Sequence, residues 1–163
     1  MAFILNESTA SIIAEAVYQE LTASHTYKHL ANYMQRIGYF GASKYFQTES
    51  ANELEHYQKH VEFINNMGGV VSLPALEEIT ETFSSLKSAL QYAYNMELTL
   101  LEVYCQWYNA LLINVDIVTA QHLLQFIQIQ QESVGEYGDL LSRVTVVEGD
   151  TCGLLLIDQE MGK

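Results

Sequence analysis

The sequence is poor in basic residues and in proline. Seven Lys and Arg residues stand against twenty Asp and Glu, so the formal net charge is −13. A surface of this charge repels phosphate backbones and anionic lipids, and we therefore expect neither a nucleic acid nor a membrane surface as a partner. A single proline and only nine glycines in 163 residues argue against a turn-rich β-sandwich. The same acidic excess attracts cations.

Long hydrophobic runs and paired cysteines are also missing. No apolar run approaches the roughly 20 residues of a transmembrane helix. The apolar start of the chain, residues 1–5, is too short for a signal peptide and has no positive charge. The two cysteines, Cys105 and Cys152, lack the spacing of a metal or redox motif, so we expect free thiols in a cytoplasmic protein. An apolar content of 49% suffices for a core, and residues 1–163 are expected to form one domain.

Apolar residues recur at helical spacing in four long segments, at about residues 8–38, 41–68, 84–112 and 116–146. A shorter segment, 150–160, predicts a small fifth helix. Short links at 38–41 and 113–115 make the first and the second pair of helices antiparallel. The connection between the pairs, about fourteen residues, spans roughly 46 Å when extended and can cross a helix of about 42 Å. The prediction is an all-α four-helix bundle with one long crossover.

Each predicted helix has an inward seam that is apolar at its ends and polar near its middle. The middle residues on the four seams are Glu20, Glu53, Glu97 and Gln130. Each lies about twelve to fourteen residues from the start of its helix, so all four lie at one depth of the bundle, whichever way a helix points. No seam contains Lys or Arg, and unpaired buried carboxylates cost several kcal/mol each. The remaining solution is a bound cation.

The types of side chain in this layer narrow the choice of metal. Glu53 and His56 are three residues apart on one helical face, so both can reach one ion. Carboxylates combined with an imidazole suit iron, manganese or zinc better than magnesium or calcium. Several carboxylates for few neutral ligands favour two metals bridged by a shared carboxylate. A lone Glu-x-x-His is common in helices, and it is the agreement of four helices that supports the metal site.

Further acidic and histidine residues lie near this layer. Glu49 is one turn before Glu53 on the same seam and is either an additional metal ligand in transit or a solvated side chain. His60 is also on the seam and is either an extra ligand or a core histidine. The remaining histidines lie off the seams and are assigned no role: His25, His29 and His122.

Over nearly its whole length the chain resembles ferritins. The matching segments are Glu20 with residues 23–27, Glu53-Leu54-Glu55-His56, Glu97, Gln130 and the tail 155–158. The resemblance implies a ferritin-like four-helix bundle, a hollow homo-oligomeric shell of 24 subunits, and iron as the metal. In ferritins the counterparts of Glu20, Glu53 and His56 hold one iron. A bridging Glu53 and Glu97 hold the second.

The resemblance also implies an activity. Ferritins of this kind are ferroxidases that oxidise Fe(II) with dioxygen at the di-iron site and store the Fe(III) mineral in the cage. The counterpart of Gln130 forms a hydrogen bond near the second iron. The counterpart of Tyr27 lies beside the di-iron site and takes part in electron transfer. The expected function is therefore iron storage and detoxification.

Three departures from related families refine this expectation. Bacterioferritins carry a second Glu-x-x-His where this chain has Gln130 and Ser133, which implies a second iron that is weakly held and passed on. Leu54 replaces the haem-binding methionine of bacterioferritins, so no haem is expected. Some prokaryotic ferritins hold a third iron with carboxylates where this chain has Asn52 and Ile129, so we expect that site to be absent in that form.

Two alternative functions remain. The first is a cage-free di-iron oxidase or peroxidase of the rubrerythrin type, against which the missing second Glu-x-x-His counts. The second is a catalytically inert structural shell subunit. The presence of all four charged ligands argues against it.

Overall fold

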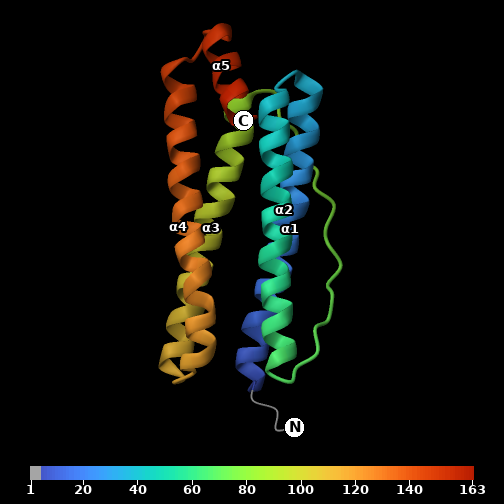
Figure 1. The fold of residues 1–163 in the computed structure, drawn as a ribbon, viewed down its shortest axis with the longest axis vertical. Coiled ribbons are helices and arrows are strands. Elements are labelled where there is room, and N and C mark those ends of the chain that lie inside the picture. Colours follow the sequence, from blue (N-terminus) through green and yellow to red (C-terminus); the bar gives the residue numbers. More distant parts are fainter. Residues whose placement is uncertain (1–4) are drawn as a thin grey trace.

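In the computed structural model, which describes residues 5–163, the chain forms five α-helices and no strand (Figure 1). The helices are α1 (Glu7–Ile37), α2 (Phe40–Asn66), α3 (Leu86–Ile113), α4 (Ile117–Val146) and α5 (Thr151–Met161). The all-α prediction is confirmed. The N-terminal run that we interpreted as too short for a signal peptide lies, but for its last residue, outside the described part of the chain.

The order and direction of the helices follow the predicted topology (Figure 1). α1 and α2 form one antiparallel pair, and α3 and α4 form the other. Residues 67–85 return along the length of the bundle as an extended connection, so α2 and α3 run parallel. The single long crossover is therefore confirmed. None of the described helices combines the length and the apolar composition needed to cross a bilayer.

Local sequence signals explain where the helices begin and end. The side chain of Asn6 accepts a hydrogen bond from the Thr9 amide and caps α1. α1 ends at Gly38, whose φ of +92° is a left-handed conformation that glycine adopts without strain. Ser85 and Ser88 form a capping box that starts α3 two residues later than the periodicity predicted.

α5 closes one end of the bundle through a contact with the start of α2. The carboxylate of Asp158 accepts hydrogen bonds from the amides of Gly41 (3.1 Å) and Ala42 (2.7 Å). These amides have no partner within their own helix, and a carboxylate at a helix N-terminus also favours the helix dipole. Gly41 is required here, because a Cβ atom would lie 1.7 Å from the Asp158 carbonyl oxygen.

Two apolar clusters fill the bundle on either side of the predicted polar layer. One cluster includes Tyr27, Met34 and Phe46, and the other includes Ile13, Leu123 and Phe126. Helical spacing predicts Ile127 on the inward seam of α4, but Phe126 is the buried residue and Ile127 is half-buried against the second cluster. Both residues lie three or four positions from Leu123 and from Gln130, so spacing alone does not choose between them.

Candidate metal centre

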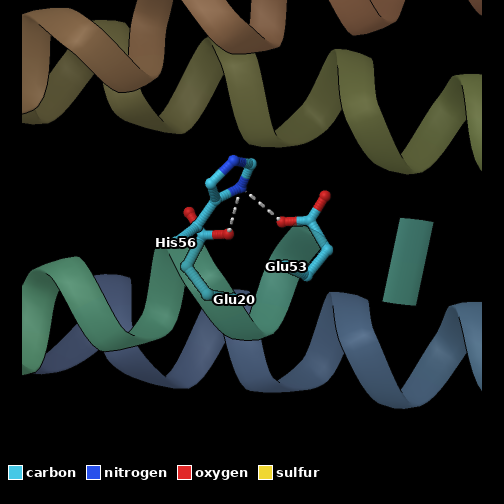
Figure 2. A group of neighbouring side chains, drawn as sticks. All are labelled: Glu20, Glu53 and His56. Atoms are coloured by element: carbon cyan, nitrogen blue, oxygen red, sulfur yellow. Dashed lines mark hydrogen bonds and ion pairs between the residues drawn. The ribbon is translucent and has the colours of Figure 1, made fainter. Parts of the chain in front are cut away.

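Glu20, Glu53 and His56 come together at the middle of the bundle, as Figure 2 shows. Glu20 comes from α1 and the other two from adjacent turns of α2, and all three side chains point into the space between the two helix pairs. The Nδ1 atom of His56 lies 3.0 Å from Glu53 Oε2 and 3.6 Å from Glu20 Oε2. One ligand atom from each residue lies within 4.8 Å of the others, so one cation can contact all three.

The structure also brings Glu97, Gln130 and Tyr27 together in this layer, from α3, α4 and α1. Gln130 Nε2 donates a hydrogen bond of 2.7 Å to Glu97 Oε2. The Tyr27 hydroxyl donates to the other oxygen, Oε1. All three residues are buried. Each oxygen of Glu97 therefore accepts one hydrogen bond from a neutral side chain.

His56 lies beside the carboxylates of Glu20 and Glu53, and the three side chains shift one another's pKa values. Burial raises the pKa of Glu53 well above its ordinary value, and the charge of Glu20 raises it further. Burial also opposes ionisation of Glu20, but contacts with His56 and His60 hold the Glu20 pKa below its ordinary value. For His56, interactions with the two carboxylates outweigh burial and raise the pKa to about 10. A metal ion at this site would compete with protons for these three side chains, so its binding depends on pH.

Glu97 titrates differently because its partners are neutral. Burial raises its pKa to about 7, although the hydrogen bonds from Tyr27 and Gln130 oppose this. The charges of Glu20 and Glu49 raise it as well. The metal-free layer therefore carries fewer negative charges at neutral pH than its number of carboxylates suggests.

Three residues beside Glu20 were not predicted to act together. The Tyr104 hydroxyl donates to Glu20 Oε1, and His60 Nε2 lies 2.7 Å from the same hydroxyl oxygen. His60 Nδ1 lies 3.0 Å from Nε2 of His122, which burial and the charge of His60 keep neutral by lowering its pKa to about 3. His60 is fully buried, with both ring nitrogens engaged. His122, which we assigned no role from the sequence, is half-buried and belongs to this chain of contacts.

A signal for two of these residues was present in the sequence. Tyr104 lies seven residues after Glu97, and His60 lies seven after Glu53. Seven residues are about two turns, so each lies on the same face as the carboxylate. His122 gave no such signal, because it lies off the α4 seam.

Glu49 lies in an acidic pocket of about 200 Å³ between α2 and α4. The pocket is lined also by Glu53, His56, Ser133 and Glu136 among others, so it borders the metal centre. Glu49 accepts a hydrogen bond of 3.0 Å from Asn52. Burial and the charge of Glu136 raise its pKa. Glu49 is thus one turn outside the group formed by Glu20, Glu53 and His56.

Comparison with known families agrees with this geometry. The family model for the ferritin-like domain matches residues 11–146, most of the chain and all four long helices. The chain belongs to the ferritin family. The resemblance seen in the sequence is thereby confirmed, and ferritin membership supports a role in iron storage.

Individual ferritins match this chain from end to end at low identity. A probable bacterial non-haem ferritin-like protein of Haemophilus influenzae is 21% identical over 159 residues, covering 98% of this chain and 96% of that protein. The bacterial non-haem ferritin of Staphylococcus aureus is 24% identical over 162 residues, with the same coverage. The open-pore ferritin of Archaeoglobus fulgidus superposes with a TM-score of 0.94 at 23% identity, over 97% of this chain and 98% of that one, and so has the same fold.

Proposed function

We propose that this ferritin oxidises Fe(II) with dioxygen at an intra-bundle di-iron site and stores the Fe(III) product as a mineral inside a cage of 24 subunits. The observation that supports this is the group formed by the buried Glu20 and Glu53 with the half-buried His56. Two carboxylates and an imidazole suit iron, and burying them without a cation is costly.

The first iron binds at Glu20, Glu53 and His56. Glu20 Oε2 is buried and accepts no hydrogen bond from any residue that the structure describes, so it is free to contact a metal. His56 enters the site as the neutral ligand once its proton has left. The ionised carboxylates stabilise Fe(III) more than Fe(II), because the attraction grows with the charge of the ion. The ligand set therefore favours oxidation.

The second iron binds between Glu53, acting as a bridge, and Glu97. Each Glu97 oxygen accepts one hydrogen bond, from Tyr27 or from Gln130, and keeps a lone pair for the ion. These donors compete with the ion for Glu97, which supports a second site weaker than the first. The two Fe(II) ions supply one electron each, and the two electrons reduce one dioxygen to hydrogen peroxide with two protons from water. Tyr27, in contact with Glu97, is placed to take part in electron transfer.

The surroundings of the centre support delivery and storage of a cation. The net charge of −13 attracts Fe(II), and the acidic pocket with Glu49 leads to Glu53 and His56. Leu54, half exposed on α2, offers no haem ligand, and we propose a haem-free protein. We place this activity in the cytoplasm, with Fe(II) and dioxygen as the substrates.

Aerobic mixing with Fe(II) in a stopped-flow spectrometer tests this function. We expect a fast oxidation phase that ends at about two Fe(II) per subunit, as a two-metal site requires, followed by slower mineral growth. Glu20→Gln retains an acceptor for Tyr104 but removes the charged ligand, and the fast phase should slow at least tenfold, as loss of a metal ligand predicts. The matched control is Glu15→Gln on the exposed face of α1, which should behave as the parent. A parent protein without a fast phase would refute the proposal.

A further inference from the structure

A buried line of hydrogen bonds connects Glu20 of the metal centre to α4. It passes from Glu20 Oε1 to the Tyr104 hydroxyl, then to His60 and on to His122. Its members come from α1, α3, α2 and α4 in turn, so all four long helices contribute one residue. Three of the four side chains are fully buried: Glu20, Tyr104 and His60.

The directions of the bonds nearest to Glu20 follow from the donor at each position. The Tyr104 hydroxyl donates its hydrogen to Glu20 Oε1. The Tyr104 oxygen is then left as an acceptor, and His60 Nε2, at 2.7 Å, must donate to it. His60 Nδ1 faces His122 Nε2 at 3.0 Å, and one of the two donates to the other.

Aromatic packing holds these donors in place. The His60 ring stacks on Phe126 with a centroid distance of 4.0 Å, and the His122 ring stacks on Phe63 at 4.0 Å. Tyr104 also packs against Phe126, at 5.8 Å and nearly parallel. Side chains locked by packing position a hydrogen bond more strictly than side chains in solvent.

The consequence for Glu20 is that its two oxygens have different surroundings. Oε1 is held by Tyr104, whereas Oε2 accepts no hydrogen bond from the described residues and faces His56 at 3.6 Å. We propose that Tyr104, held in turn by His60 and His122, is a positioning residue that presents Glu20 to the first metal ion through Oε2 alone. This inference rests on the proposed function insofar as it takes that site to bind the first iron.

Anaerobic Co(II) titration of the metal-stripped protein, followed by calorimetry and by visible absorption, tests the inference without oxidation. Tyr104→Phe removes only the hydroxyl. The matched control is Tyr137→Phe, which removes a hydroxyl that is also fully buried but forms no hydrogen bond with the described residues. Loss of a residue that orients a metal ligand costs about 10–100-fold in affinity.

For Tyr104→Phe we expect the tighter Co(II) binding step to weaken by about tenfold, whereas Tyr137→Phe leaves it unchanged. We also expect the visible bands of bound Co(II) to change in Tyr104→Phe, since Oε1 becomes free to approach the metal. A loss of less than threefold in the tighter step, or an equal loss in Tyr137→Phe, would overturn the inference.

A second variant tests the outer part of the line, and it serves also if Tyr104→Phe does not fold. His122→Phe retains a ring against Phe63 at a half-buried position but removes the nitrogen that faces His60. We expect it to weaken the same binding step by about threefold, less than Tyr104→Phe does. Unchanged Co(II) binding by a folded His122→Phe variant would show that His122 does not help to position Glu20, and would overturn that part of the inference. Tight Co(II) binding by a parent protein that fails to oxidise Fe(II) would refute the proposed function and leave the positioning role standing.

Discussion

The side chain of Gln130 on α4 donates a hydrogen bond of 2.7 Å to Glu97 on α3, and the other Glu97 oxygen receives the Tyr27 hydroxyl. Each oxygen of this carboxylate accepts one hydrogen bond from a neutral donor, whereas Glu20 Oε2 accepts none from the described residues. A second ion must therefore compete with two donors for Glu97, while the first ion meets an oxygen of Glu20 that no hydrogen bond holds. The two halves of the centre differ before any metal arrives.

Gln130→Glu should destabilise the metal-free protein and strengthen metal binding at the second site. In the metal-free protein the new carboxyl group lies beside Glu97, and two buried acids in contact raise each other's pKa and destabilise the fold. We expect a melting temperature several degrees lower, since about 1 kcal/mol corresponds to 2–4 °C in a chain of this size. Anaerobic Zn(II) titration should show tighter binding of the second ion, because a charged ligand replaces an amide.

The control for this variant is Gln128→Glu, which adds the same charge at an exposed position of α4. Its melting temperature and its affinity for the second Zn(II) ion should stay close to those of the parent. Weaker or unchanged Zn(II) binding in Gln130→Glu would show that residue 130 does not face the second metal.

Glu97→Gln should change how the stability of the metal-free protein depends on pH. The pKa of Glu97 is raised from 4.5 to about 7, so the unfolded chain ionises first and the folded state loses stability as pH rises through this window. Between about pH 5.5 and pH 8 the parent should lose about 2 kcal/mol that Glu97→Gln retains. Chemical denaturation in chelator at one protein concentration measures the difference. Glu102→Gln, exposed on α3, should follow the parent. Parallel pH curves for the parent and Glu97→Gln would contradict the burial of an ionisable Glu97.

Glu49→Gln distinguishes the two interpretations of this residue. If Glu49 passes iron through the acidic pocket, the fast phase of the first two Fe(II) per subunit should be unchanged, and later turnovers should slow by a few-fold. The matched control is Glu62→Gln, exposed on the same helix. A loss of the fast phase would instead make Glu49 a ligand of the centre. Parental kinetics throughout would mean that Glu49 is a solvated side chain.

Native mass spectrometry and sedimentation should show an assembly of 24 subunits. Beyond the ferritin fold, the apolar side chains left exposed on the single chain support assembly, among them Ile113, Val115 and Leu156. A stable monomer or dimer with iron oxidation intact would favour the cage-free oxidase alternative. A full cage without oxidation would favour the inert shell subunit.

Much of the fold could be predicted because it depends on local physics. The helical period, the glycine at 38 and the short links place the helices and pair them, and residues 69–83 are long enough for a connection that crosses the bundle. The depth argument placed Glu20, Glu53, Glu97 and Gln130 in one layer because the rise per residue is constant along every helix. Counting did not choose between Phe126 and Ile127, because positions three and four residues along a helix lie on the same face.

The side chains that enter the polar layer follow from the sequence, since helical periodicity sets which face of a helix a residue occupies. The pairing of each hydroxyl with a carboxylate oxygen depends on how the helices pack together. Tyr104 reaches Glu20 across 84 residues of sequence, and His60 reaches His122 across 62. Such contacts depend on the distance and rotation between packed helices and on the rotamers that packing permits. The residues of the polar layer were therefore predictable as a set, whereas the difference between the two oxygens of Glu20 was not.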